Sequence, residues 1–242
     1  MTWNEICYFG IVGKLTQTDE GVNLLWIYGA ALVCMVIAYF LGSLNFAIII
    51  SKARFGEDIR TKGSGNAGLT NMLRTYGKIP ALMTLLGDML KAALSVYIGL
   101  FAAGERGAYL AAFACMIGHC FPAYYNFRGG KGVLVAATSI LCLEPMVFAF
   151  VIIIFIIMVA FLRYVSLGSI TAAFMYPILL SKMYGMIHHL PNGTIPIIPL
   201  LVSILISLTI IIQHHENIKR LREGTENKLS FHKKKDNEKN EK

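Results

Sequence analysis

The sequence predicts an all-α integral membrane protein with about seven transmembrane helices, its N-terminus outside and its C-terminus in the cytoplasm. Three observations support this class. Of the 242 residues, 56% are hydrophobic and 15% are charged, whereas a typical soluble domain carries about 25% charged residues. The mean hydropathy is +0.60. Long apolar runs recur along the chain, and the basic residues are concentrated in a few of the segments between them.

The apolar runs define the predicted helices in order. A helix needs about 20 apolar residues to cross about 30 Å of hydrocarbon. The run at 132–143 is too short to cross unaided, and we expect it to form a hairpin with the next helix. The predicted spans are 24–50, 79–103, 108–126, 132–143, 146–162, 168–187 and 196–213.

The basic residues set the orientation of these helices, because cytoplasmic loops carry an excess of Lys and Arg. If the first helix runs from outside to inside, the cytoplasmic segments are 51–78, 127–131, Arg163 and the tail. Together they hold 18 of the 22 basic residues. This bias is lost if 132–143 does not cross, so that segment is predicted to cross.

Three regions follow from this topology. Residues 1–23 form an extracytoplasmic leader of unknown role, 24–213 form the membrane domain, and 214–242 form a basic cytoplasmic tail. Nine basic residues crowd the last 24 positions. A basic tail could suggest nucleic acid, but this one follows a membrane span and has no interleaved aromatic residues. We therefore predict contact with anionic lipid headgroups and no nucleic-acid partner.

The first unusual cytoplasmic segment is 58–78, DIRTKGSGNAGLTNMLRTYGK. It contains G-x-G-x-x-G, but a dinucleotide site needs a preceding strand and a βαβ unit, which cannot exist between two membrane helices. Glycines let backbone N–H groups approach an anion, and a helix starting here would add its positive end. We predict anion binding; a solvated connector is the alternative. The polar candidates are Ser64, Asn66, Thr70, Asn71 and Arg74.

The second segment is 118–132, GHCFPAYYNFRGGKG. Its glycines free backbone amides, while Lys131 supplies a point charge and Arg128 a forked one. This combination predicts a second anion site. The alternative is a hairpin turn whose cations only hold it on one side of the membrane. His119 lies on an apolar helix and is interpreted as a core histidine.

Two further segments bring polar side chains to the same face. In RYVSLGSIT, Ser166 and Ser169 lie at the mouth of a helix, where serines can also merely cap it. In QHHENIKRLREGTE, His214 and Asn217 are three residues apart and share one helix face. A plain interfacial helix end is the alternative for this pair.

The sequence also excludes several function classes. Neither H-x-x-x-x-D nor G-x-S-x-G occurs, which removes the soluble-type acyltransferase motif and the serine nucleophile elbow. No Cys/His cluster or carboxylate pair suggests a metal. Asp88 and Lys91, inside a predicted helix, are interpreted as a structural ion pair. A membrane enzyme, a transporter for a phosphorylated solute and a non-catalytic scaffold remain, and the lack of an internal repeat speaks against the transporter.

These segments resemble the bacterial acyl-phosphate:glycerol-3-phosphate acyltransferases of the PlsY type. The resemblance covers the chain from about residue 30 to 226. It implies a seven-helix fold in the bacterial plasma membrane, with the N-terminus outside and the active site on the cytoplasmic face. Gly168 stands where the family often has alanine, and the leader is longer than usual. The matching pieces are GSGNAGLTNMLRTYGK, LLGDMLKA, GHCFPAYYNFRGGKGV, RYVSLGSITA and HHENIKRLREGTE.

The resemblance also implies a reaction. A long-chain acyl group would move from acyl phosphate to the 1-hydroxyl of sn-glycerol 3-phosphate, giving lysophosphatidate and phosphate. No metal or other cofactor is implied, and the upstream acyl-phosphate-forming enzyme is a candidate partner. Ser169, His214 and Asn217 would orient the reacting groups. Either His214 or a substrate phosphate oxygen could accept the hydroxyl proton. The residues that would hold phosphate groups are Ser64, Asn66, Arg74, Gly129, Gly130 and Lys131.

Overall fold

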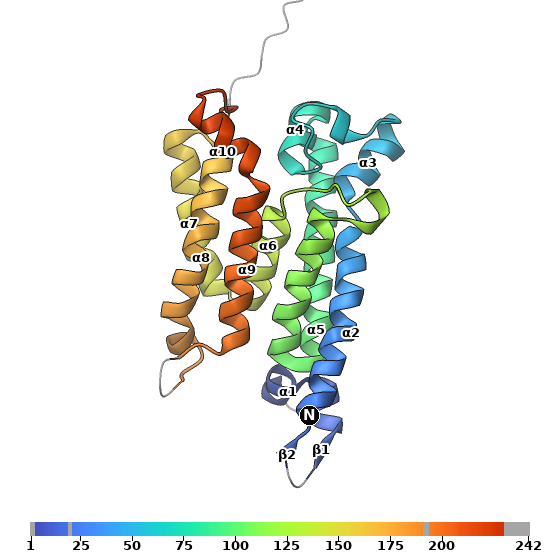
Figure 1. Cartoon of the computed structure of the whole chain (residues 1–242), viewed down its shortest axis with the longest axis vertical. Helices are drawn as coiled ribbons and strands as arrows, with labels where there is room; N and C mark the ends of the chain where they lie inside the picture. The colour runs from blue at the N-terminus through green and yellow to red at the C-terminus, as the bar shows by residue number, and fades with distance from the viewer. Residues whose placement is uncertain (1–2, 19–20, 191–193, 230–242) are drawn as a thin grey trace, which may run out of the picture.

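The computed structural model describes residues 3–18, 21–190 and 194–229. It is an elongated bundle of helices with a short antiparallel β1–β2 pair at one end (Figure 1). The Lys-rich part of the predicted tail lies outside the described residues. The elements are α1 (Trp3–Leu15), β1 (Gln17–Thr18), β2 (Gly21–Val22), α2 (Leu24–Ser43), α3 (Phe46–Phe55), η1 (Ile59–Thr61), α4 (Leu69–Tyr76), α5 (Lys78–Cys120), η2 (Ala123–Tyr125), α6 (Val133–Leu143), α7 (Pro145–Leu162), α8 (Val165–Ile187), α9 (Ile197–Gln213) and α10 (His215–Arg222).

The described helices give a multi-pass integral membrane protein. Four spans are long and apolar enough to cross a bilayer, or five if α9 and α10 form one bent span. The predicted number was about seven. The difference arises because α5 contains two of the predicted spans, and because α6 has only 11 residues, fewer than the ~20 that cross unaided.

The first predicted helix, 24–50, is broken in the structure. It ends at Ser43, and a second helix, α3, begins at Phe46; together they form one candidate span, Leu24–Phe55. Asn45 caps α3, because its side-chain oxygen accepts a hydrogen bond from the Ile48 N–H at 3.2 Å. An asparagine side chain satisfies one of the free N–H groups of a helix start in this way. The polar residues Ser43 and Asn45 accompany this boundary, but the prediction counted them as part of one apolar run.

Helix α5 is a hairpin of two arms that turn at Ala103 and Gly104, where the backbone leaves helical geometry. A Cβ atom on Gly99 would lie 2.3 Å from the carbonyl oxygen of Gly107. Residues eight apart in a straight helix are separated by about 12 Å, so the arms must fold back on each other. Figure 1 shows them side by side. The two predicted spans 79–103 and 108–126 correspond to these arms.

Small residues allow α2 to pack closely against α5. A Cβ atom on Gly42 would lie 2.0 Å from the Cys115 carbonyl oxygen, and one on Gly118 would lie 2.1 Å from the Tyr39 carbonyl oxygen. Helices in a bilayer gain little from the hydrophobic effect and associate through such close contacts. This packing fixes the scaffold on which the polar loops are built.

A buried charged cluster joins α2 and the two arms of α5. The Lys91 ammonium lies 2.8 Å from Asp88 Oδ1 and 3.0 Å from His119 Nδ1. It also donates to the carbonyl oxygens of Gly42 at 2.9 Å and Leu44 at 2.8 Å. The predicted ion pair between Asp88 and Lys91 is present, with His119 as an additional member.

The two ends of the bundle differ in character. At one end lie α3, α4, the FRGGKG loop, the α7–α8 junction and α10 (Figure 1). At the opposite end lie α1, the β1–β2 pair and the turn of α5. The α1 helix contacts this turn, since a Cβ atom on Gly10 would lie 2.5 Å from backbone atoms of Ala102. The segments singled out by sequence therefore share the first end.

Candidate functional site

A cavity of about 510 Å³ opens at the end of the bundle that carries these segments. Its lining changes along its length. The outer part is polar and the inner part is apolar, reaching down between α6, α7, α8 and α9. The main polar lining residues are Ser64, Asn66, Arg74, Lys131, Ser166, Ser169, His214, Asn217, Arg220 and Glu226. The main apolar ones are Leu134, Ile140, Phe148, Val151, Phe155, Ala173, Tyr176, Ile206 and Ile210.

The loop before α4 is built around the buried amide of Asn71. Its Nδ2 donates to the carbonyl oxygens of Lys62 and Asn66, both at 3.0 Å. Its Oδ1 accepts from the backbone N–H of Ser64 at 3.0 Å. Asn71 was predicted to help bind an anion, but its amide is occupied in holding the loop. Its role is structural.

This loop turns sharply so that Ser64, Asn66 and Arg74 reach the cavity. Gly63 and Gly65 have φ angles of 57° and 73°, in the left-handed region that glycine adopts at no steric cost. The two glycines of the G-x-G pattern therefore allow the backbone to form this turn. Arg74 follows on the last turn of α4 and brings its guanidinium to the lining.

Backbone hydrogen bonds hold the FRGGKG loop against the C-terminal end of α5. The N–H of Gly129 donates to the Cys120 carbonyl oxygen at 3.0 Å, and the N–H of Gly130 donates to the His119 carbonyl oxygen at 3.1 Å. A Cβ atom on Gly130 would lie 2.2 Å from His119 Nε2. Neither Gly129 nor Gly130 lines the cavity. The structure thus gives their amides a different role from the predicted phosphate contact.

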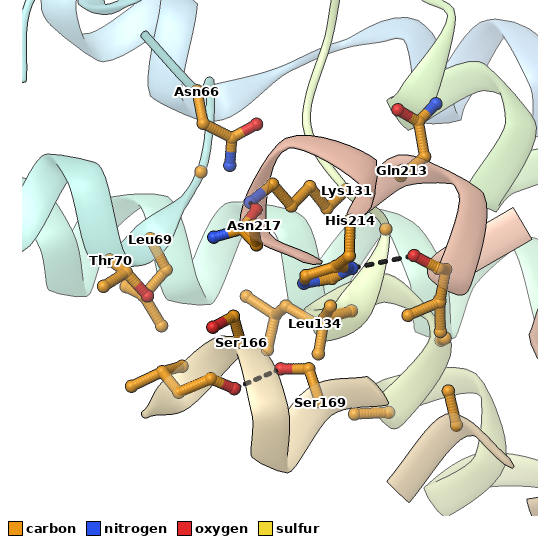
Figure 2. Close-up of a pocket in the computed structure, with 18 of the residues that line it drawn as sticks. Asn66, Leu69, Thr70, Lys131, Leu134, Ser166, Ser169, Gln213, His214 and Asn217 are labelled. Atoms are coloured by element: carbon orange, nitrogen blue, oxygen red, sulfur yellow. Dashed lines mark hydrogen bonds between the residues drawn. The ribbon is translucent and has the colours of Figure 1, made fainter. Parts of the chain in front are cut away.

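Lys131 projects from this loop into the cavity, where its ammonium donates to Asn217 Oδ1. Figure 2 shows Lys131, His214 and Asn217 close together, with Asn66 on one side and Ser166 and Ser169 on the other. Burial, together with the positive charges of Arg220 and Arg74, lowers the pKa of Lys131 to about 8. A cation whose charge is so poorly compensated is suited to receive an anion.

The two serines at the start of α8 have different partners. The Ser169 hydroxyl donates to the carbonyl oxygen of Val165 at 2.9 Å, within its own helix (Figure 2). The Ser166 hydroxyl donates to Glu226 Oε1 at 2.9 Å. Both line the cavity. Ser166 therefore does more than cap the helix, since it ties α8 to the segment after α10.

His214 lies at the junction of α9 and α10 and is 2% exposed. Its Nδ1 is 2.7 Å from the carbonyl oxygen of Ile210 (Figure 2). A carbonyl oxygen only accepts, so Nδ1 carries the proton. In the neutral ring the lone pair is then on Nε2. A backbone carbonyl, instead of a carboxylate, thus fixes the orientation of this imidazole.

Sequence reasoning assigned no role to Glu226, which organises this part of the site. Its Oε1 accepts from Asn217 Nδ2 at 2.6 Å, and its Oε2 accepts from Arg220 Nε at 2.7 Å. Burial alone would raise the pKa of Glu226, but the hydrogen bonds from Arg220, Asn217 and Ser166 lower it below its ordinary value. The carboxylate therefore stays ionised and holds Asn217 with its Oδ1 toward Lys131.

The segment that carries Glu226 returns toward α8 after α10. The N–H of Leu229 donates to the carbonyl oxygen of Arg163 at 2.7 Å, and the Lys228 ammonium lies 5.5 Å from the centre of the Tyr164 ring. The tail is thus anchored beside the cavity at least as far as residue 229. The stretch 214–226 holds three acidic residues, Glu216, Glu223 and Glu226, so the sequence alone does not single out Glu226.

Fold and site together define a class: an integral membrane protein with a cationic cavity that continues into an apolar groove. The comparisons with known proteins agree. A family model described as glycerol-3-phosphate acyltransferase matches residues 32–224. A glycerol-3-phosphate acyltransferase of Clostridioides difficile strain 630 is 39% identical over 204 residues, covering 82% of this chain and 95% of that protein. The chain belongs to the glycerol-3-phosphate acyltransferase family.

Two crystal structures of PlsY, an integral membrane glycerol 3-phosphate acyltransferase, share the fold. Its glycerol 3-phosphate form superposes with a TM-score of 0.74 at 33% identity, covering 84% of this chain and 96% of that chain. Its lysophosphatidic acid form gives a TM-score of 0.70 at 31% identity, with the same coverage. These similarities agree with the resemblance seen in the sequence motifs.

Proposed function

We propose that this enzyme transfers a long-chain acyl group from acyl phosphate to the 1-hydroxyl of sn-glycerol 3-phosphate, releasing lysophosphatidate and inorganic phosphate. The observation that carries the proposal is the division of one cavity into a cationic mouth and an apolar groove. Both proposed substrates are phosphates, and one of them also carries an acyl chain. A water-soluble acceptor and a lipid-like donor could therefore meet at the mouth.

The depth of the groove supports an acyl chain as its occupant. Lining residues extend from Ser169 to Tyr176 along α8 and from His214 to Ile206 along α9. Seven or eight residues of helix correspond to about 10–12 Å. With C–C bonds of about 1.5 Å, each carbon advances an extended chain by about 1.3 Å, so about eight carbons fit. The rest of a long chain would lie among the lipids.

In this proposal, the cations of the mouth neutralise the two substrate phosphates. Lys131 and Arg74 would hold phosphate oxygens, with Ser64 and Asn66 as hydrogen-bonding partners. An acyl phosphate is an activated mixed anhydride, so no covalent enzyme nucleophile is needed. The protein then contributes mainly proximity and charge neutralisation in a cleft with little water.

The acceptor hydroxyl must lose a proton as it attacks the acyl carbonyl. We propose that Nε2 of His214 takes this proton, because the Ile210 carbonyl holds the ring with that nitrogen as the acceptor. Asn217, fixed between Lys131 and Glu226, would orient a substrate group beside it, as would Ser169. The oxygen of a substrate phosphate is the competing proton acceptor.

The pH dependence of kcat/KM tests Lys131 and His214 together, because it reports ionisations of the free enzyme. Lys131 must be protonated to bind phosphate, so kcat/KM should fall as the pH rises through about 8. In Lys131→Arg this fall in kcat/KM should occur at a higher pH, since arginine stays charged.

His214 must be neutral to accept a proton, so kcat/KM should also fall as the pH is lowered. His214→Gln should have a low kcat/KM that no longer falls in acid. A His214→Gln enzyme with the wild-type rate and profile would exclude the histidine base.

For the topology, we propose that α2, both arms of α5, α6, α7, α8 and α9 each cross the membrane, with the cavity facing the cytoplasm and residues 1–23 outside. The support is the charge distribution, because the segments assigned to the cavity side hold 18 of the 22 basic residues. A membrane-impermeant thiol reagent added to intact cells should not label a cysteine placed at Lys62. Rapid labelling there would contradict this orientation.

The reaction itself is tested with purified protein in detergent and EDTA, supplied with palmitoyl phosphate and glycerol 3-phosphate. Phosphate release should require both substrates and yield lysophosphatidate, and palmitoyl-CoA should be inert as donor. A folded protein that binds glycerol 3-phosphate but turns over neither donor would contradict the proposal. In that case flux of glycerol 3-phosphate into liposomes, the transporter alternative, would be measured.

A further inference from the structure

A second polar cluster lies at the opposite end of the bundle from the substrate cavity. It consists of Glu105, Glu144 and His188. Glu105 begins the second arm of α5, Glu144 joins α6 to α7, and His188 ends α8. One possible ligand atom from each residue lies within 4.8 Å of the other two. These residues are 39 to 83 positions apart in the chain, so only the fold brings them together.

The cluster is held by hydrogen bonds from tyrosines. The Tyr109 hydroxyl donates to Glu144 Oε1 at 2.9 Å, and the Tyr184 hydroxyl donates to Glu105 Oε1. The ring of His188 stacks on that of Tyr184, with centroids 4.1 Å apart, and its Nε2 lies 3.0 Å from Glu144 Oε1. In metal sites of proteins, hydrogen bonds of this kind, from residues that do not touch the ion, orient the ligand side chains.

The charges of the cluster are not balanced by its neighbours. Within the part of the chain that the structure describes, neither Glu105 nor Glu144 has a Lys or Arg nitrogen within 4.0 Å. Among the described residues, His188 is the one cationic side chain this close, and it pairs with Glu144. Two carboxylates this close repel each other unless a cation or a shared proton lies between them.

We propose that Glu105, Glu144 and His188 bind a divalent transition-metal ion, Zn²⁺ or Mn²⁺. Two carboxylate oxygens and one imidazole nitrogen form a mixed donor set that suits these ions. Around tetrahedral zinc, with bonds near 2.1 Å, ligand atoms are about 3.4 Å apart. Small side-chain rotations therefore close the cluster around an ion. The His188 side chain is 35% exposed and offers a path from solvent.

The ion would join the turn end of α5, the α6–α7 junction and the end of α8. These elements include three helices of the groove, at the end remote from the reacting groups. The inferred role is structural: a ligand that binds only the folded state stabilises that state. The site is independent of the proposed reaction, because no cluster residue lines the substrate cavity.

The test is thermal unfolding of the tag-free, EDTA-stripped protein in detergent, with and without ZnCl₂ or MnCl₂, together with measurement of the metal bound after desalting. At 100 times the dissociation constant, the melting temperature should rise by about 5–10 °C, with one ion retained per chain. No shift and no retained metal would overturn the proposal, including the case in which the two carboxylates simply share a proton.

Two variants assign the binding to this cluster. His188→Asn and Glu105→Gln should each lose the metal-dependent shift, while their acyltransferase activity and metal-free melting temperature remain near wild type. His188 is partly exposed, so His188→Asn should fold even if Glu105→Gln does not. The matched control is His215→Asn, which removes the exposed His215–Glu216 pair, 3.4 Å apart, at the other end. An undiminished shift in His188→Asn would place the metal elsewhere and refute the assignment.

Discussion

Replacing Lys131 by alanine is expected to lower kcat/KM by about 30- to 1000-fold, with the protein still inserted and folded. In the proposed reaction, the lost contact would neutralise charge on a substrate phosphate inside the cavity, and such a contact contributes about 2–4 kcal/mol to transition-state stabilisation. The side chain donates to Asn217 and is not part of the helix packing. Initial rates of phosphate release with both substrates varied would measure the loss.

The matched control for this variant is Lys219→Ala. Lys219 lies on α10 at the same end of the bundle, but its side chain is exposed and does not line the cavity. Its removal deletes the same charge from the same end and should change kcat/KM by less than about twofold, because long-range effects of exposed charges are screened. Equal losses in the two variants would mean that net charge matters and that the proposed phosphate contact does not.

Replacing Glu226 by alanine should be nearly as damaging, although Glu226 need not touch either substrate. The change removes the common acceptor of Ser166, Asn217 and Arg220. Leaving buried donors without an acceptor costs about 1–3 kcal/mol, and Asn217 would lose its orientation. We expect kcat to fall by about 10- to 100-fold and the melting temperature to drop.

Two comparisons separate this positioning role from general destabilisation. Glu226→Gln keeps an acceptor oxygen and should recover part of kcat, whereas Glu223→Ala, at an exposed position on the same segment, should be close to wild type. If Glu226→Ala loses stability but retains its kcat at a temperature where it is folded, Glu226 serves the fold alone.

Much of the helical architecture could be predicted because membrane spans are continuous apolar runs. The spans at 146–162, 168–187 and 196–213 lie within three residues of α7, α8 and α9. The predicted span 24–50 lies within the span Leu24–Phe55, but a helix boundary inside it was missed. Asn45 caps a second helix there, and the polar residues Ser43 and Asn45 that accompany the break were counted as part of the apolar run.

The residues of the site could be predicted better than their partners. Seven of the nine proposed site residues line the cavity, because polar and glycine-rich segments between apolar runs are conspicuous. The contacts of Ser166 with Glu226 and of Glu105 with Tyr184 join residues 60 and 79 positions apart. Sequence spacing reveals neighbours one helical turn away, so such pairs appear only once the helices are packed.

The most direct test of acyl-chain binding in the groove is photolabelling with an acyl phosphate that carries a diazirine near its eighth carbon. We expect glycerol-3-phosphate-dependent turnover of this donor in the dark. After illumination, we expect crosslinks to the deep groove layer formed by Ile140, Phe148, Tyr176 and Ile206, which excess unlabelled donor should suppress. Crosslinks confined to lipid-facing positions such as Phe161 and Ile212, both exposed, would show that the acyl chain does not enter the groove.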